Sequence, residues 1–80
     1  MARVHLSSGL TRHTDGVEDF EIDAPRVREL TEMLAKRFPG LAGEIEQLAV
    51  AIDGRIYNEA PYHPLHADTE VYFVPRVGGG

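Results

Sequence analysis

The 80-residue sequence contains no cysteine. This absence excludes a disulfide framework, a thiolate metal site and a cysteine nucleophile, and it is compatible with a reducing cytoplasm. No apolar run approaches the roughly 20 residues needed to span a bilayer, and residues 1–5 lack the apolar core of a signal peptide. We therefore expect a cytoplasmic protein that does not associate with membranes.

Basic residues are also in short supply, since 13 Asp and Glu residues face 8 Lys and Arg residues and the net charge is −5. Nucleic-acid binding depends on Lys and Arg side chains that neutralise phosphates, so the charge argues against a nucleic-acid partner. An acidic surface is better suited to a protein partner with a basic surface. A chain this short buries only about 60–65% of its unfolded surface, which leaves little room for an enclosed active site.

Apolar spacing in the first half of the chain predicts two strands and a helix. Residues 3–7 and 19–22 alternate as half-buried strands and form a hairpin with a long connection. Apolar residues at helical spacing follow, and we expect Pro25 to occupy the first helical position. Pro39-Gly40 is expected to end this helix, with the glycine as its cap, and residues 41–47 to add a short helical turn.

The second half of the chain is typical of strands. Residues 48–52 form a nearly continuous apolar run, and Asp53-Gly54 is a strong two-residue hairpin signal that leads into residues 55–57. A loop covers residues 58–67, and the last strand covers residues 71–74. Because that strand is apolar on both faces, we expect it in the middle of the sheet.

This order of elements predicts an α+β fold in which a mixed four- to five-stranded sheet packs on one main helix. The arrangement is that of the ubiquitin-like β-grasp fold. We expect the β-grasp domain to cover residues 1–77 and a flexible glycine tail to cover residues 78–80.

The tail, Gly78-Gly79-Gly80, offers only backbone and a terminal carboxylate. Without side chains it can enter a channel too narrow for other residues, and in extended form residues 77–80 reach about 13 Å beyond the strand. The carboxylate has a pKa of about 3.5, is ionised at neutral pH, and is a poor electrophile until it is activated. A frayed end or a residual linker is the alternative interpretation of these glycines.

The two faces of the last strand have different predicted roles. Val71 and Phe73 are expected to point at the helix, while Tyr72 and Val74 form an apolar docking patch on the opposite face. Val74 is the residue on which we expect binding to depend most. The alternative is that both faces are ordinary core.

Other polar residues are expected to be plain surface. The pair His63 and His66 has metal-ligand spacing, but Pro64 argues against a helix that would bring the rings together, so we expect solvated histidines and no metal site. Paired carboxylates are expected to be surface acids, because no concave site of adequate size is expected in this fold. These predictions cover the histidines His5, His13, His63 and His66 and the acids Asp19, Glu21, Asp23, Glu44 and Glu46.

Three segments resemble the sulfur-carrier branch of β-grasp proteins, which includes the small subunit of molybdopterin synthase (MoaD) and the thiamin sulfur carrier (ThiS). Residues 69–80 are similar to the family's acidic residue, apolar strand, proline and terminal Gly-Gly, and residues 50–54 are similar to its hairpin. Residues 37–41 resemble a helix-end motif of the MoaD branch. The chain departs from the family in Pro75-Arg76, where two prolines are common, and in the additional Gly78.

The resemblance implies a carrier that acts with catalytic partners and is not itself an enzyme. The Gly80 carboxylate, presented after Gly79, would attack the α-phosphate of ATP inside an E1-like adenylating enzyme. A persulfide from a sulfurtransferase would then displace AMP, and the product would be a C-terminal thiocarboxylate. No permanently bound cofactor is implied, because ATP is used by the activating partner.

The resemblance also implies a partner-binding segment and an acceptor. The segment comprises Tyr72, Val74, Pro75, Arg76, Val77 and Gly78. Arg76 either steers the tail into an acidic channel or is a solvated charge. The favoured acceptor is the large subunit of molybdopterin synthase. Synthesis of thiamin, cysteine or another thio-metabolite remains an alternative, as do isopeptide bonding to lysines and a non-covalent interaction module.

Overall fold

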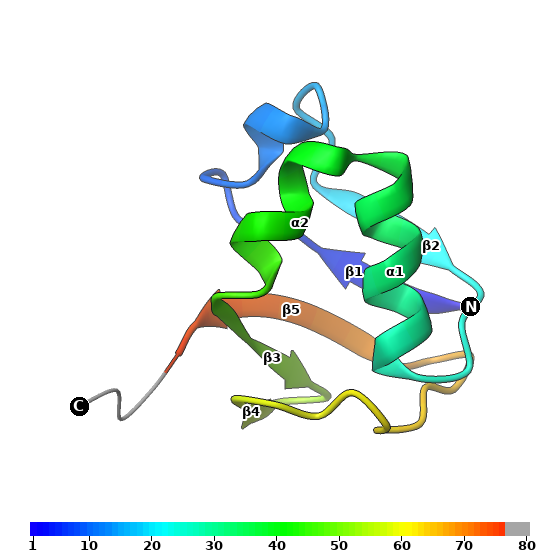
Figure 1. Ribbon diagram of the computed structural model, residues 1–80. Helices are drawn as coiled ribbons and strands as arrows, with labels where there is room; N and C mark the ends of the chain where they lie inside the picture. The colour runs from blue at the N-terminus through cyan, green and yellow to red at the C-terminus, as the bar shows by residue number, and fades with distance from the viewer. Residues whose placement is uncertain (77–80) are drawn as a thin grey trace.

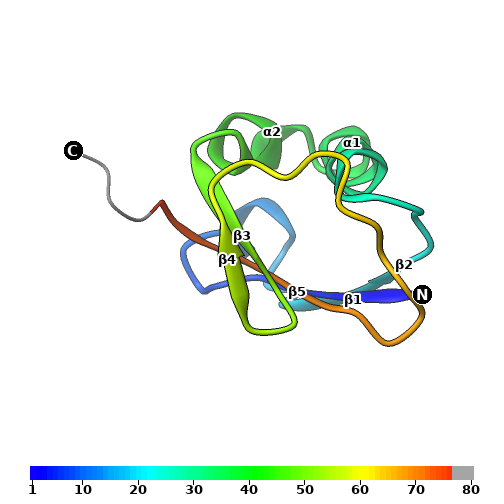
Figure 2. The ribbon, with the colours of Figure 1, turned by 90° about the horizontal axis from the view of Figure 1, so that it is seen from below.

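In the computed structural model, which describes residues 1–76, a five-stranded sheet carries both α-helices on one of its faces (Figures 1 and 2). The α+β, ubiquitin-like β-grasp prediction is confirmed. The predicted tail, residues 78–80, and the predicted domain end at Val77 lie outside the described residues. The elements, in chain order, are β1 (Ala2–His5), the short 3-10 helix η1 (Thr11–His13), β2 (Asp19–Ile22), α1 (Val27–Arg37), α2 (Pro39–Ile45), β3 (Leu48–Ile52), β4 (Arg55–Tyr57) and β5 (Glu70–Pro75).

The last strand, β5, lies at the centre of the sheet, as its two apolar faces predicted. The strand order is β2-β1-β5-β3-β4, with β5 parallel to β1 and antiparallel to β3. Val71 aligns with Val4 of β1, and Phe73 aligns with Val50 of β3. The strand that leads to the end of the chain is therefore hydrogen-bonded on both sides.

Helix α1 begins later than the sequence predicted. Pro25 was expected at the first helical position, but Arg26 is extended and the helix starts at Val27. The chain before the helix is held by a distant loop: Arg26 forms a β-bridge with Pro64, and the carbonyl of Pro25 accepts the N–H of Leu65 at 2.9 Å. This long-range pairing overrides the local preference of proline for a helix start.

The same loop caps the helix. The N–H of Val27 donates to the carbonyl of His63 at 3.1 Å, and the N–H of Arg28 donates to the carbonyl of Pro61 at 2.8 Å. The first N–H groups of a helix have no partner within it and need one elsewhere. Since loop carbonyls supply that partner, no side chain of the Arg26 N-cap is required.

The expectation that Gly40 caps the main helix is wrong. Helix α1 ends at Arg37, Phe38 is the residue between the helices, and Pro39 occupies the first turn of α2. Proline suits that position because its missing N–H would have no partner there. Gly40 is needed for space, since a Cβ on it would lie 2.5 Å from Nδ1 of His13.

The core fills the space between the helices and the covered face of the sheet. The apolar stripe of α1 contributes to it, and the Asp53-Gly54 hairpin joins β3 to β4 with positive φ angles of 48° and 88°, as predicted. Burial of these side chains is the main stabilising contribution to the fold. The buried core comprises Ala2, Val4, Leu6, Leu10, Phe20, Ile22, Ala24, Val27, Leu30, Leu34, Leu41, Ile45, Val50, Ile52, Leu65, Val71 and Phe73.

Candidate functional site

The two faces of β5 have opposite exposure. Val71 is fully buried and Phe73 is 5% exposed, whereas Tyr72 is 45% exposed and Val74 is partly exposed. The alternation follows from the pleat of a strand, which sends successive side chains to opposite faces. The predicted orientation of these four side chains is confirmed, and their predicted role in binding remains a prediction.

The uncovered face of the sheet carries a row of apolar side chains, which we call the open-face patch: Ala51, Ile56, Tyr72 and Val74. Tyr72 aligns with Ala51 of β3, which in turn aligns with Ile56 of β4, and Val74 aligns with Ala49. Ile56 is 52% exposed. Since neither helix lies on this side of the sheet (Figure 2), the patch is available to a partner.

A polar cluster borders the open-face patch at β1. Nδ1 of His5 lies 2.6 Å from Oδ1 of Asp19, and its Nε2 lies 2.5 Å from Oε1 of Glu70. The ring stacks on Tyr72, with 4.5 Å between ring centroids and 21° between planes. Carboxylates only accept hydrogen bonds, so a ring that donates to both of them is an imidazolium. The His5 ring, held by the two carboxylates, covers one face of the Tyr72 ring.

The pKa of His5 reflects two opposing effects. Burial lowers the pKa because it disfavours the charged ring, but the hydrogen bonds to Asp19 and Glu70 outweigh it, and the pKa lies above its ordinary value. The three residues form one charge-assisted unit on the open face of the sheet.

The expectation of plain surface residues is wrong for three of the four histidines and for two of the acids. His63 is half-buried, with its ring centroid 5.1 Å from that of Tyr57. His5 and Asp19 belong to the cluster just described. Nε2 of His13 lies 2.7 Å from Oε2 of Glu44, and Arg12 donates to the other oxygen of Glu44 at 2.6 Å. The contacts of Arg12 and His13 with Glu44 connect the η1 segment to α2. These charged side chains therefore have a structural role.

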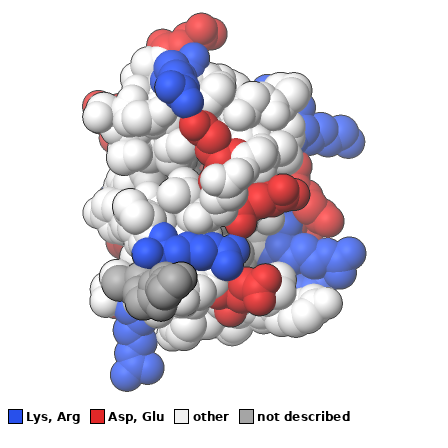
Figure 3. Space-filling view, turned by 60° about the vertical axis from the view of Figure 1, so that its left-hand side comes forward, with Lys and Arg blue, Asp and Glu red and all other residues white. Residues whose placement is uncertain are grey.

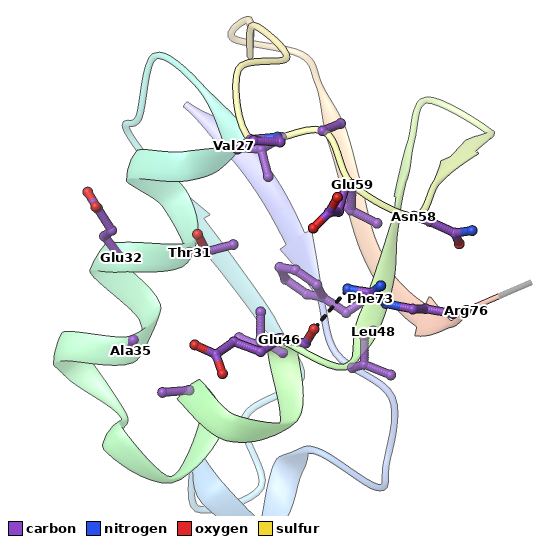
Figure 4. Close-up of a pocket in the computed structure, with 15 residues that line it drawn as sticks. Val27, Thr31, Glu32, Ala35, Glu46, Leu48, Asn58, Glu59, Phe73 and Arg76 are labelled. Atoms are coloured by element: carbon purple, nitrogen blue, oxygen red, sulfur yellow. Dashed lines mark hydrogen bonds between the residues drawn. The ribbon is translucent and has the colours of Figure 1, made fainter. Parts of the chain in front are cut away.

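Arg76 has a structural contact that the sequence did not suggest. Its Nη2 donates to the backbone carbonyl of Glu46 at 2.9 Å, across the end of α2 (Figure 4). Pro75 precedes it as the last residue of β5. The base of the chain's final segment is thereby tied to the helical layer as well as to the sheet. Steering by Arg76 remains a prediction.

A groove of about 360 Å³ lies on the helix side of the molecule, next to Arg76. Its walls come from α1, α2, β3 and residues 58–61, with Phe73 and Leu48 in its floor (Figure 4). The expectation that the fold has no concave site of adequate size is therefore wrong. The groove arises because residues 58–61 pass along α1 and leave a gap above β3, which the sequence could not reveal.

No group of three or more His, Asp or Glu side chains within residues 1–76 is arranged to hold a metal ion. In that same part of the chain, neither helix has the length and apolar character that crossing a membrane requires. The remaining predicted site residues, Val77, Gly78, Gly79 and Gly80, lie outside the described residues.

The sequence alone missed the His5 cluster, Ile56 and the groove. His5 and Glu70 are 65 positions apart and meet only because β1 pairs with β5 in parallel. For Ile56 a signal was present, because the hairpin at Asp53-Gly54 places it opposite Ala51. Counting two residues outward from the turn in each direction would have paired Ile56 with Ala51 and placed both on the same face of the sheet.

Comparisons with known proteins agree with this architecture. The profile of the ThiS family matches residues 9–80. No curated protein sequence matches the chain.

Solved structures are similar over nearly their whole length. A putative molybdopterin converting factor subunit 1 from Pyrococcus furiosus is 25% identical, with 95% of this chain and 97% of that chain covered and a TM-score of 0.78. Small archaeal modifier protein 1 from Methanosarcina acetivorans is 19% identical, with 99% and 95% covered and a TM-score of 0.81. A chain from the BexX/CysO complex of Amycolatopsis orientalis is 17% identical, with both chains fully covered and a TM-score of 0.83. The last two show a shared fold.

Proposed function

Because the chain belongs to the ThiS family of ubiquitin-like carriers, we propose that it carries sulfur on the C-terminal carboxylate of Gly80. The family match supports the proposal, since it includes Gly79 and Gly80. The observation that carries it is the placement of β5, a central strand that ends at Pro75, shortly before this segment in the sequence. A strand held on both sides is a rigid base from which a partner can take up a glycine segment.

In the proposed reaction, an oxygen of the Gly80 carboxylate attacks the α-phosphate of ATP, and pyrophosphate leaves. A persulfide sulfur then attacks the acyl-adenylate, so that a C–S bond forms and AMP leaves. A thiol of the sulfur-donating partner cleaves the resulting acyl disulfide and leaves a thiocarboxylate on Gly80. An E1-like adenylating enzyme supplies the ATP site and the cations that stabilise the phosphate charge.

The partner-binding surface in this proposal is the open-face patch together with the end of β5. Tyr72 and Val74 give apolar contact, Pro75 and Arg76 hold the base of the segment, and Val77 and Gly78 follow them into the partner. The exposed ring of Tyr72, which is already stacked on His5, loses little freedom on binding. Aromatic residues in such positions commonly contribute much of the binding free energy.

The acceptor we propose is molybdopterin synthase, with its large subunit as the partner that uses the thiocarboxylate. The similarity to a putative molybdopterin converting factor subunit 1 supports this choice. Synthesis of thiamin, cysteine or another thio-metabolite uses the same carrier chemistry and remains an alternative. We place the protein in the cytoplasm, where ATP and reduced sulfur donors are available.

A second candidate function is protein modification, in which the activated Gly80 forms an isopeptide bond with a lysine. The fold shared with small archaeal modifier protein 1 supports this second candidate. Adenylation is common to both functions, so the species that follows adenylation distinguishes them.

The test is intact mass spectrometry of the chain after co-expression with an E1-like enzyme and a sulfurtransferase from the same organism. A sulfur carrier gains the mass difference between sulfur and oxygen, and a variant without Gly79 and Gly80 does not. Lysine adducts without a thiocarboxylate species would establish the modifier instead. An unmodified chain whose partners still bind after the two glycines are removed would indicate a non-covalent interaction module.

A further inference from the structure

The groove beside Arg76 lies on the side of the molecule opposite to the open-face patch. Helices α1 and α2 form one wall of it, and β3 and residues 58–61 form the other. Apolar side chains, among them Ala35, Ala42, Leu48 and Phe73, cover most of the groove. Its volume of about 360 Å³ falls within the range of about 300–1,000 Å³ that is typical of ligand sites. It is large enough to bury an apolar side chain of another protein.

The rim of the groove is acidic. Glu32, Glu46 and Glu59 contribute to it from three different segments of the chain. The side view in Figure 3 shows acidic side chains in the middle of the face at which β5 ends, with a basic side chain crossing between them and other basic side chains around them. A negatively charged ligand such as a nucleotide is disfavoured here, and a positively charged one is favoured.

Two of these carboxylates lack a cationic partner among residues 1–76. Glu32 pairs with Arg28, but no Lys or Arg side chain of the described chain forms an ion pair with Glu46 or Glu59. Arg76, which is the only basic residue in the lining within residues 1–76, donates to the backbone carbonyl of Glu46 and leaves the carboxylate of that residue unpaired. Both glutamates are exposed and available to an incoming basic side chain.

The position of the groove connects it to the reactive end of the chain. Arg76 lines the groove and is the residue directly before Val77 (Figure 4). A protein that takes up residues 77–80 must therefore contact the molecule close to the groove. Of the partners in the proposed function, the E1-like enzyme is the one that both sulfur transfer and protein modification require.

We propose that this groove is a second docking site for the E1-like adenylating enzyme. It receives a segment of that enzyme in which an apolar side chain, seated against Ala35 and Ala42, is flanked by lysine or arginine. Glu46 and Glu59 pair with these basic side chains. The enzyme then binds the carrier on both sides of the sheet. It makes apolar contacts with the open-face patch, and it makes apolar contacts and ion pairs in the groove. This inference rests on the proposed function.

The test measures ATP–pyrophosphate exchange by the E1-like enzyme of the same organism at varied concentrations of the full chain. The double variant Glu46→Lys and Glu59→Lys reverses the rim charge at two exposed positions and keeps the carbonyl that holds Arg76. We expect KM for the carrier to rise about tenfold at unchanged kcat, because opposite charges in contact contribute on this order. In the wild type, salt should raise KM because it screens the attraction, and in the variant this rise should disappear or change sign because the rim charges are reversed.

Two further variants separate charge from shape. Ala42→Phe fills the groove without a change of charge and should also raise KM. The matched control, Glu18→Lys with Asp68→Lys, makes the same change in net charge at exposed positions outside the groove lining and should leave KM near the wild-type value. If Ala42→Phe fails to fold, as judged by circular dichroism, the rim variant and its control still decide the question.

Three results would overturn the inference. In the first, both groove variants are adenylated with the wild-type KM, which leaves the proposed function intact and removes only the second docking site. In the second, the wild-type chain is a dimer by sedimentation and the rim variant is a monomer, which assigns the groove to another copy of this chain. In the third, the wild-type chain is not adenylated at all, which removes the proposed function and the docking site with it.

Discussion

The inward and outward side chains of β5 alternate along one strand, yet they lie in opposite surroundings. Val71 and Phe73 are packed between the sheet and the helices, while Tyr72 and Val74 face away from both helices. From this difference in burial we expect the inward pair to contribute most to the free energy of unfolding and the outward pair to contribute little. We therefore expect substitutions on the inward face of β5 to change mainly the free energy of unfolding, and substitutions on its outward face to change mainly the affinity for a partner.

The largest expected effect is on the inward face. Phe73→Ala should lower the free energy of unfolding by about 3–5 kcal/mol, because it removes a buried ring and leaves a cavity. That is a large share of the roughly 4–12 kcal/mol expected for a chain of 80 residues. Tyr72→Ala, one residue away, should cost about 1 kcal/mol or less. Urea unfolding followed by circular dichroism compares the two, and equal losses would contradict the separation of the faces.

The outward face should show the reverse pattern. Val74→Asp places a charge in the open-face patch, and we expect kcat/KM for adenylation by the E1-like enzyme to fall about 100-fold, as expected when a central contact is replaced by an unpaired charge. The melting temperature should change little. Val74→Thr, with nearly the same shape, is the control and should retain most of the activity. Normal adenylation of a folded Val74→Asp chain would remove this face from the binding surface.

The His5 cluster lies on the outward face of the sheet, and its contribution to the free energy of unfolding should depend on pH. The pKa of His5 is raised in the folded chain, so folding favours the protonated ring. Its stabilising contribution is complete below the ordinary pKa of about 6.5 and is lost as the pH rises through the higher folded pKa.

His5→Asn should remove this dependence. The difference in urea midpoint between wild type and variant should therefore shrink as the pH rises above the ordinary histidine pKa of about 6.5. A difference in urea midpoint that stays constant as the pH rises would show that the cluster stabilises the fold without titrating.

The smallest effect is expected at the margin of the open-face patch. Ile56→Ser on the edge strand β4 should change the free energy of unfolding by no more than about 0.5 kcal/mol, because the side chain is largely exposed. The KM for the carrier should rise about two- to threefold, as expected for a residue away from the centre of an interface. Met33→Ser, at an exposed apolar position on α1, is the control and should leave KM unchanged.

The order and type of the elements could be predicted because the signals are local. Alternation and helical spacing are set by neighbouring residues, and the Asp53-Gly54 turn requires only two residues that tolerate positive φ. The central place of β5 could be predicted as well. Strands with apolar side chains on both faces are typical of the interior of a sheet, where a neighbouring strand lies on each side. Errors occurred where distant residues decide: the start of α1 depends on Pro64, and the need for Gly40 depends on His13.

For the candidate site, the sequence alone determined the alternation of buried and exposed side chains along β5 and the glycine segment that follows it. Both are properties of consecutive residues, and neither depends on what the rest of the chain does. Only the tertiary structure decided which side chains join them. Parallel pairing of β1 with β5 set His5 against Tyr72, and the path of residues 58–61 opened the groove beside Arg76. Such contacts depend on strand register and on loop path, which hydrophobic pattern restricts but does not fix.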